Sequence, residues 1–290
     1  MINKHLSLPF KSIWYERLIL DIPSDRECCV IIVDAALRML KQDYLKKLLG
    51  QKHVRGVLVL VNSLDAQSRA ILEIKKLIPQ IDWDDIYTFD PGDVEKYHFK
   101  NLGCCYYSMH SPSDILEQYG NARRSDVYFT GTIKGGREQL IMLVFEKLYG
   151  ASVDCNFNIM IIGERRFKKK QHNDVIRYYS GGWIPYEKVL ADVLNSDVIL
   201  EVVQEGQRGP SLRYYEAVCY NKCLLTNNPD IKSFPYYDSR YMKIFKDADD
   251  IDLNWIKKKQ KIDYRYRGDF SPLNMLDVVM GEGKDCFPII

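Results

Sequence analysis

The chain has 290 residues, of which 46% are hydrophobic and 28% are charged, and its formal net charge is +2. This composition excludes a disordered chain and supplies enough apolar side chain for two domains. The small net charge argues against a strong whole-molecule field, so no nucleic-acid partner is expected. Eight cysteines are present without a CxxC unit. A chain of this length does not need disulfides, so reduced thiols are expected.

No segment has the length and apolarity of a membrane-spanning helix. The N-terminal stretch MINKHLSLPFKSIWYERL carries charges throughout and has no long apolar core, unlike a signal peptide. Together with reduced thiols, this favours a cytoplasmic protein. The basic runs at 168–170 and 257–259 indicate either solvated faces or peripheral contact with the inner membrane.

Apolar runs alternate with helical patterns in the first part of the chain. Strands are predicted at 29–33, 57–61 and 86–89, and helices at 35–49 and 67–77. The strands are continuous Val, Ile and Leu runs, as a sheet buried on both faces requires. The short links between strand and helix indicate right-handed crossovers in a parallel sheet.

A less periodic segment, 90–126, separates this part from a second alternating part. There, strands are predicted at 127–131, 157–163, 197–203 and 223–228, and helices at 137–149, 186–195 and 211–219. The sequence therefore predicts an α/β protein with two Rossmann-like domains, 1–123 and 124–269, whose parallel sheets face an interdomain cleft. The tail 270–290 is expected to cross back to the first domain. Ligands of such sheets bind outside the carboxyl ends of the strands.

A glycine-rich turn, GTIKGGR, follows the strand predicted at 127–131 and opens a helix. Gly131 lets the backbone approach a ligand closely, and Lys134 and Arg137 can meet a phosphate. The spacing is neither GxGxxG nor that of a P-loop, which disfavours dinucleotide and ATP binding. A plain strand-to-helix turn remains the alternative interpretation.

A second loop, EGQRGP, breaks the strand predicted at 197–203, and Ser211 can cap the helix that follows. Free amides at a helix N-terminus stabilise anions. Arg213 lies in the first turn and Glu216 follows one turn later, so the two suit the diphosphate and the ribose of a nucleotide sugar. A structural turn would not need Glu205 and Gln207, which are therefore also assigned to the donor site.

These segments resemble the donor-binding domain of GT-B glycosyltransferases, in particular bacterial enzymes of lipopolysaccharide and capsular polysaccharide synthesis. The matching pieces are DVYFTGTIKGGR, IPYEKVLADVLNSDVILEVVQEGQRGPSLRYYEA and LLTNNPDIKSF. The resemblance implies that Glu216 holds the ribose, Arg213 with Lys134 or Arg137 the phosphates, and the segment around Ile184 the base. Many retaining members carry two glutamates separated by seven residues. Here ten residues separate Glu205 from Glu216, which leaves the role of Glu205 and the stereochemistry open.

Acidic residues follow two of the strands predicted in the first domain. Asp34 follows 29–33 and Asp90 follows 86–89, so both are expected at the cleft edge. An inverting transferase needs a carboxylate or a histidine to take the proton of the acceptor hydroxyl. Asp34 is the first candidate, Asp90 the second and His110 the third. The alternative for the two aspartates is a helix cap or a turn.

The sequence thus predicts a glycosyltransferase of the hexosyltransferase type. The donor would be a nucleotide-diphosphate sugar, and the acceptor a hydroxyl of a glycan or a lipid-linked glycan in surface polysaccharide biosynthesis. No cofactor or metal is expected, since no acidic, histidine or cysteine cluster has ligand spacing. Two alternatives stay open: a sugar-nucleotide epimerase on the same fold, and a non-catalytic nucleotide-sugar-binding scaffold subunit.

Overall fold

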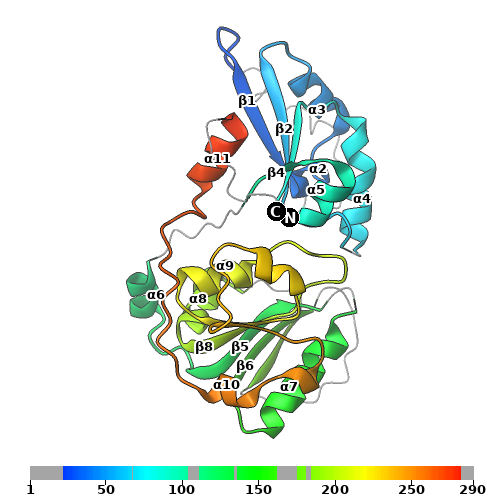
Figure 1. Cartoon of the computed structure of the whole chain (residues 1–290). Coiled ribbons are helices and arrows are strands. Elements are labelled where there is room, and N and C mark those ends of the chain that lie inside the picture. Colours follow the sequence, from blue (N-terminus) through cyan, green and yellow to red (C-terminus); the bar gives the residue numbers. More distant parts are fainter. Residues whose placement is uncertain are drawn as a thin grey trace.

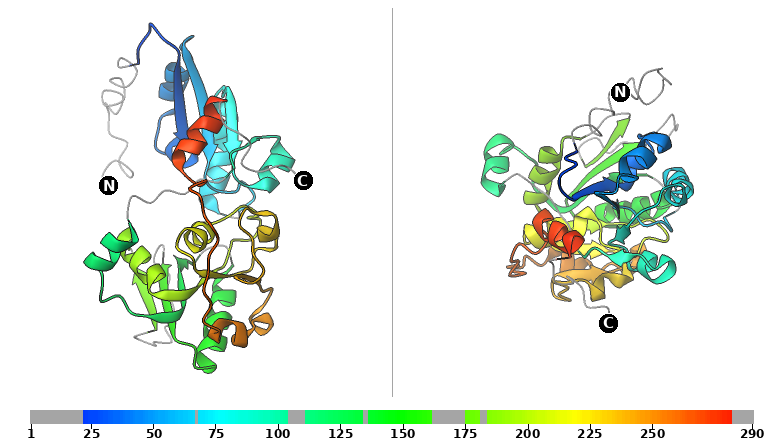
Figure 2. Two further views of the ribbon diagram at one scale, coloured as in Figure 1. Left: turned by 60° about the vertical axis from the view of Figure 1, so that its left-hand side comes forward. Right: turned by 90° about the horizontal axis from the view of Figure 1, so that it is seen from above.

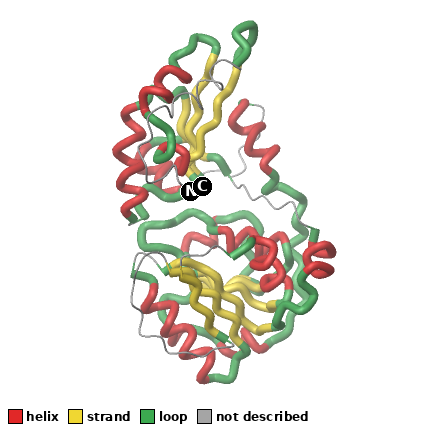
Figure 3. Tube along the Cα trace, turned by 180° about the vertical axis from the view of Figure 1, so that it is seen from behind, coloured by secondary structure: helices red, strands yellow, loops and turns green. Residues whose placement is uncertain are grey.

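A computed structural model describes residues 22–66, 68–103, 111–133, 136–161, 175–180 and 184–281. These residues form two α/β units, stacked one above the other in Figure 1, and each unit is built on a parallel sheet. Helices lie on both sides of each sheet, as seen from behind in Figure 3. The predicted fold class, an α/β protein with two Rossmann-like units on parallel sheets, is confirmed.

The N-terminal unit has a four-stranded sheet in the order β1-β2-β3-β4, with every pair parallel. Its strands are β1 (Cys28–Val33), β2 (Val54–Leu60), β3 (Asp85–Thr88) and β4 (Lys100–Asn101). Its helices are α2 (Asp34–Leu37), α3 (Gln42–Leu49), α4 (Arg69–Leu77), the 3-10 turn η2 (Ile78–Gln80) and α5 (Pro91–Tyr97), followed by α6 (Pro112–Gln118), which packs against α8 of the second unit.

The C-terminal unit has a six-stranded sheet in the order β10-β9-β8-β5-β6-β7, again with every pair parallel. Its strands are β5 (Ser125–Thr132), β6 (Cys155–Ile161), β7 (Ile176–Ser180), β8 (Ser196–Glu201), β9 (Cys223–Thr226) and β10 (Met242–Ile244). Its helical elements are α7 (Glu138–Gly150), α8 (Tyr186–Leu194), α9 (Leu212–Cys219), η3 (Pro229–Ser233), η4 (Ala248–Asp250) and α10 (Leu253–Lys257).

The strand order shows at which edge the second sheet is expected to bind a ligand. The chain begins at β5 in the middle of the sheet and runs outward through β6 to β7. It then crosses back to β8, beside β5, and continues outward in the other direction through β9 to β10. This is the doubly wound order in which ligands bind where the direction reverses, outside the carboxyl ends of the strands. Here the reversal lies between β5 and β8, whose carboxyl ends are Thr132 and Glu201.

Each sheet is covered on both faces by apolar helix faces. In the C-terminal unit, α7 and α10 cover one face and α8 and α9 the other. In the N-terminal unit, α2, α3 and α4 cover one face, while α11 (Pro272–Met280) covers part of the other through Val279. The Arg55 guanidinium donates to the carbonyl of Val279 at 2.8 Å. The chain after α10 thus returns along the C-terminal unit to the N-terminal one, a path seen in Figure 2.

The predicted strands agree with the structure to within a few residues, and most predicted helices do as well. The helix predicted at 35–49 is in fact two helices, α2 and α3, separated by a turn at 38–41. The segment 90–126, expected to be irregular, contains α5, β4 and α6. The tail from 270 onward contains α11, which packs on the N-terminal sheet.

Candidate functional site

A cavity of about 600 Å³ lies between the two units at the reversal point of the C-terminal sheet. The C-terminal unit contributes the ends of β5 and β8, the start of α8, and the loop and first turn leading into α9. The N-terminal unit contributes the residues that follow β2 and β3. The position agrees with the expectation that a ligand binds in the interdomain cleft at the strand ends.

Many of the predicted donor-site residues lie in the wall of this cavity. The lining includes Gly131, Arg137, Ile184, Gln207, Ser211 and Arg213. Glu205 and Glu216 are not among the lining residues. Lys134 lies outside the described residues, as does His110. The structure therefore brings six of the predicted donor residues to one surface.

The N-terminus of α9 is fixed to the sheet by a buried carboxylate, Glu201, which was not among the predicted site residues. Ser211 caps the helix by accepting a hydrogen bond from the Arg213 amide at 3.1 Å, as predicted. The Ser211 hydroxyl itself donates to Glu201 at the end of β8, and the Thr226 hydroxyl donates to the other Glu201 oxygen. Burial raises the pKa of Glu201. Glu201 lines the cavity as well, yet only its place at the end of an apolar strand marks it in the sequence.

Arg213 and Glu216 form a buried ion pair behind the cavity wall. Arg213 Nη1 lies 2.7 Å from Glu216 Oε2, although the two atoms are not aligned as a hydrogen bond. The Tyr186 hydroxyl donates to the other Glu216 oxygen at 2.9 Å. The Glu216 side chain has no exposed surface, whereas 12% of the Arg213 side chain is exposed. The prediction that Glu216 faces a ribose is not met in this structure: its carboxylate supports Arg213 from behind.

The stability of the protein is expected to depend on pH through Glu216. Burial raises its pKa to about 7, against opposing contributions from Arg213 and Tyr186, whereas the ordinary value is 4.5. Because the folded state holds this proton more tightly, stability from Glu216 is fully present below pH 4.5 and is lost as pH rises through 7. The loss amounts to about 3 kcal/mol.

Urea unfolding of the wild type and of Glu216→Gln between pH 5 and pH 8 measures this effect. The variant is expected to gain stability relative to the wild type over that range, because glutamine does not titrate. A difference between the two proteins that does not change with pH would contradict the assignment. Each curve is measured with reductant present, since free cysteines are buried in the sheet.

Arg137 bridges the two strands at the reversal point. Its guanidinium donates to the Thr132 carbonyl at 3.0 and 2.6 Å and to the Val202 carbonyl at 2.7 Å. Burial lowers its pKa, but an arginine stays charged at neutral pH. Three of its five N–H groups are thus directed at backbone carbonyls. Arg137 was predicted to meet a phosphate. In the structure, its guanidinium also joins the ends of β5 and β8 by hydrogen bonds to their backbone.

The loop after β8 is oriented differently from the prediction. The amides of Arg208 and Gly209 donate to the Asp90 carboxylate of the N-terminal unit at 2.9 and 2.8 Å, so they do not face the cavity. Glu205 is exposed. Gln207 does line the cavity, and its side-chain amide donates to the Gly209 carbonyl at 3.4 Å. The amides were expected to bind a diphosphate; in this structure their anion is a protein carboxylate.

Neither aspartate proposed as the catalytic base lines the cavity. Asp90 is the N-cap of α5 and accepts from the Gly92 amide at 2.8 Å, which is the alternative role considered for it. Asp34 begins α2 and is fully buried. Its carboxylate accepts from the side-chain amide of Asn62 at 3.2 Å, and burial raises its pKa. Asn62 lines the cavity, so Asp34 lies behind the cavity wall and contacts it through the Asn62 side chain.

The N-terminal wall of the cavity is mostly apolar. Val61, which follows β2, is 44% exposed, and Phe89 and Leu102 lie on the same wall. The polar side chains there are Asn62 and Ser63. Among the described residues, this wall contains no carboxylate and no histidine. The wall can hold an apolar or weakly polar group and offers an amide and a hydroxyl for hydrogen bonds.

No three acidic, histidine or cysteine side chains come together as a metal site within the part of the chain that the structure describes. Across those same residues, no helix has both the length and the apolarity needed to cross a membrane. Of the basic run at 257–259, Lys257 donates to the Ala151 carbonyl and Lys259 pairs with Asp126 and Asp197. Two of its three ammonium groups therefore contact the protein itself.

Comparison with family models yields no match, and comparison with curated proteins yields none either. Among solved structures, the chain is similar to an alpha-glucosyltransferase in complex with UDP-glucose and DNA containing an abasic site. The identity is 11%, 92% of this chain and 74% of that chain are covered, and the TM-score is 0.49. It is also similar to a UDP-forming alpha,alpha-trehalose-phosphate synthase from Burkholderia vietnamiensis, with 11% identity, coverage of 84% and 66%, and a TM-score of 0.48.

A third similar structure is the Glycosylation Associate Protein complex from Streptococcus agalactiae. Here the identity is 10%, the coverage is 94% of this chain and 58% of that chain, and the TM-score is 0.49. The chain therefore spans less than two thirds of the length of the synthase and of this complex. These similarities concern the fold, so the function has to be argued from the site.

Proposed function

We propose that this protein is a glycosyltransferase that moves a sugar from a nucleotide-diphosphate donor to an acceptor hydroxyl. The observation that carries the proposal is the position of Arg213. Its side chain lines the interdomain cavity at the N-terminus of α9, next to the reversal point of the sheet. A helix N-terminus and a guanidinium on one wall together favour a diphosphate there.

The rest of the C-terminal wall suits the remainder of such a donor. Ile184, Val189 and Met160 give an apolar surface for a flat base, and Tyr186 lines the same cavity. Glu201 supplies a carboxylate whose two oxygens already accept from hydroxyls. Arg213 would stabilise the charge that develops on the departing diphosphate, a contribution that is large in an enclosed site.

The acceptor would approach from the N-terminal wall. Asn62 and Ser63 can hydrogen-bond a hydroxyl, and the apolar side chains around them exclude water. Exclusion of water limits hydrolysis of the donor. Asp34 fixes the Asn62 amide, because it accepts from Nδ2 and so leaves Oδ1 for another donor. We propose that Asp34 is a positioning residue, which orients the Asn62 side chain so that its Oδ1 can accept a hydrogen bond from the acceptor hydroxyl.

The finer part of the proposal rests on the resemblance of the segments quoted above. It names a glycan or lipid-linked glycan acceptor, surface polysaccharide biosynthesis, and work at the cytoplasmic face of the inner membrane without a bound metal. Of the lysines considered for membrane contact, Lys258 is exposed. Assays of membrane binding and of activity in EDTA address these points separately from the donor question.

A second candidate, a non-catalytic nucleotide-sugar-binding subunit, is favoured by one observation. The described residues of the N-terminal wall supply no group that could take a proton directly. The two candidates share the donor site and differ in turnover. Donor binding without release of nucleotide diphosphate, across a range of sugar acceptors, would decide for the binding subunit.

A panel of nucleotide sugars tests the donor site itself. One of the UDP-, GDP- or dTDP-sugars is expected to raise the unfolding temperature. A ligand that binds only the folded state adds about 2.7 kcal/mol to the free energy of unfolding at a concentration of a hundred times its Kd. CMP-sugars, with a single phosphate, are expected to stabilise less. If no member of the panel stabilises the folded protein, the proposed function is wrong.

A further inference from the structure

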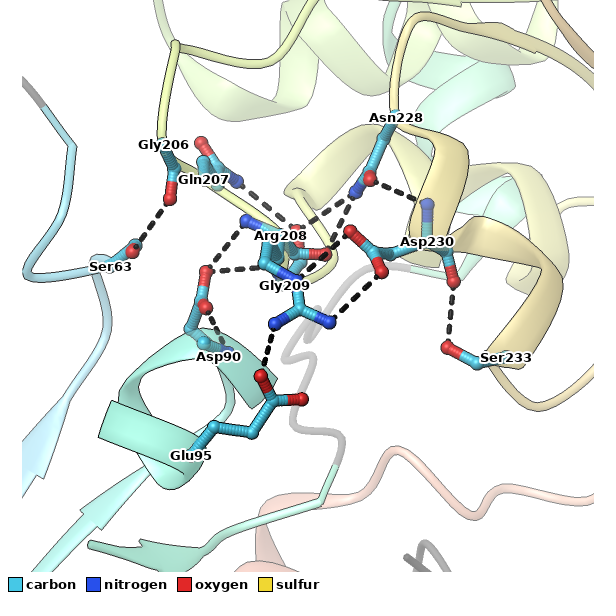
Figure 4. A network of polar contacts seen from close by, with 11 residues as sticks. Ser63, Asp90, Glu95, Gly206, Gln207, Arg208, Gly209, Asn228, Asp230 and Ser233 are labelled. Carbon is cyan, nitrogen blue, oxygen red and sulfur yellow. Dashed lines mark hydrogen bonds and ion pairs between the residues drawn. The ribbon is translucent and has the colours of Figure 1, made fainter. Parts of the chain in front are cut away.

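The loop of residues 203–211, called here the docking loop, leaves the C-terminal sheet and contacts the N-terminal unit. Figure 4 shows its central part between Ser63, Asp90 and Glu95 on one side and Asn228 and Asp230 on the other. Asp90 lies 118 residues before Arg208 in the chain. The contact therefore connects the two units through space at the edge of the cavity.

The Asp90 carboxylate has two separate tasks in this contact. Oδ1 accepts from the Gly92 amide and caps α5, while Oδ2 accepts from the successive amides of Arg208 and Gly209 at 2.9 and 2.8 Å. Two successive amides aimed at one oxygen form an anion-binding site. The Asp90 side chain is fully buried, so water does not compete for these hydrogen bonds.

Two glycines of the docking loop are required by the closeness of the contact. Gly206 has φ +83°, and a Cβ there would lie 2.4 Å from the Asp65 carbonyl oxygen. A Cβ on Gly209 would lie 3.0 Å from Asp90 Cα. The Ser63 hydroxyl also donates to the Gly206 carbonyl at 3.3 Å. The backbones of the two units meet directly at these positions.

Side chains hold the docking loop from both units. The Arg208 guanidinium pairs with Glu95 of α5 at 2.6 Å and binds both oxygens of Asp230 at 3.2 Å. The Asn228 amide donates to the carbonyls of Arg208 and Gly209 at 3.0 and 3.4 Å. The loop is thus attached to its own unit and docked on the other.

The opposite side of the same loop forms part of the cavity wall through Gln204, Gln207, Pro210 and Ser211. We propose that Asp90 is a positioning residue that holds the docking loop against the N-terminal unit and thereby keeps the two units together around the cavity. Loss of the hydrogen bonds from Arg208 and Gly209 would free the loop and let the units separate. This inference does not depend on which ligand the cavity takes.

Hydrogen exchange and small-angle scattering of the ligand-free, full-length protein test the inference. Asp90→Asn keeps the shape of the side chain, but asparagine has only one accepting oxygen. That oxygen can accept from the Gly92 amide or from the loop amides, but not from both. The amides of Arg208 and Gly209 are expected to exchange at least about tenfold faster in this variant, because local opening exposes them. The radius of gyration is expected to rise.

Gly206→Ala approaches the same contact from the loop side and is expected to give the same two changes. Each variant has a matched control. Asp252→Asn alters another aspartate cap, that of α10, far from the docking loop in sequence. Gly268→Ala imposes the same left-handed strain where a Cβ would meet nothing within 4 Å. Neither control is expected to change exchange at Arg208 and Gly209.

Slow exchange at Arg208 and Gly209 in folded Asp90→Asn, with an unchanged radius of gyration, would overturn the proposal. The same result in Gly206→Ala would overturn it if Asp90→Asn does not fold. Faster exchange in the two controls as well would show a general loss of stability and would also count against it. Because no nucleotide is added, failure here is distinct from failure of the donor panel.

Discussion

Arg213→Ala is expected to lower donor affinity by about 100-fold and turnover by about 10²–10³-fold. A hydrogen bond to a charged group contributes about 1.5–3 kcal/mol, and a guanidinium can make two such bonds to a diphosphate. Loss of one stabilising group at a developing anion commonly costs turnover to this extent. Calorimetry with the donor identified by the panel measures the affinity, and steady-state rates measure the turnover.

The same change is also expected to destabilise the fold, because it leaves Glu216 buried without its cation. Breaking a buried pair from one side costs about 3–5 kcal/mol. The pKa of Glu216 is already raised to about 7, so the orphaned carboxyl can take up a proton and the cost should be smaller at pH 6 than at pH 8. Stability and binding must therefore be measured separately.

The double variant Arg213→Ala, Glu216→Gln separates the two effects. It is expected to recover much of the stability of the fold while donor binding stays lost. Glu216→Gln alone is expected to weaken donor binding less than Arg213→Ala does, since Glu216 does not line the cavity. If Glu216→Gln loses as much affinity as Arg213→Ala, then Glu216 contacts the nucleotide, as the resemblance implied.

The fold could be predicted because its central strands are long, apolar runs. β2 and β8 are buried on both faces, and this is the pattern that identifies a parallel sheet between helices. The strands that escaped prediction are short or polar: β4 has two residues, β10 has three, and β7 reads IRYYS. Their positions depend on pairing with a neighbour and not on their own sequence.

Two missed helices did carry a local signal. α5 begins with Asp90 as its cap and Pro91 in its first turn, and α6 begins in the same way with Ser111 and Pro112. Proline after a capping residue is typical of a helix start. Proline and glycine also mark loops, and the weak periodicity of 90–126 favoured an irregular segment.

The candidate site shows where sequence reasoning ends. The positions of Arg213 and Ser211 in the cavity wall could be predicted, because they follow from a local helix start. Glu216 was assigned to a ligand because spacing along a helix gives a face, whereas the structure shows that this face is buried. The partner of the loop amides could not be predicted, since Asp90 is far away in the sequence and only the folded chain brings it there.

The second large effect is expected from Arg137, and it concerns stability first. In Arg137→Met the carbonyls of Thr132 and Val202, two residues that line the cavity, lose their hydrogen-bond donor. A buried acceptor left unsatisfied costs about 1–3 kcal/mol, so the two carbonyls together predict a loss of about 2–6 kcal/mol. For a chain of this size the unfolding temperature should fall by about 10 °C.

Arg137→Lys distinguishes this structural role from the phosphate contact that the sequence predicted. A lysine keeps the positive charge but cannot reach both carbonyls in the geometry of a guanidinium. If Arg137 acts mainly by joining β5 and β8, the lysine variant loses stability and keeps most of its donor affinity once folded. If it acts mainly on a phosphate, both variants fold as the wild type does and the methionine variant loses affinity.

Arg123→Met serves as the control for a general effect of removing an arginine from this sheet. Its guanidinium donates to the Cys155 carbonyl at 3.1 Å and pairs with Asp154, at the opposite edge of the sheet from the cavity. Because 33% of its side chain is exposed, water can replace these contacts, and a smaller loss of stability is expected. Equal losses of stability in Arg123→Met and Arg137→Met would mean that the hydrogen bonds of Arg137 between β5 and β8 stabilise the protein no more than those of Arg123. A larger loss of stability in Arg137→Met, measured by urea unfolding at one pH, would establish that the hydrogen bonds of Arg137 to the ends of β5 and β8 stabilise the cavity wall.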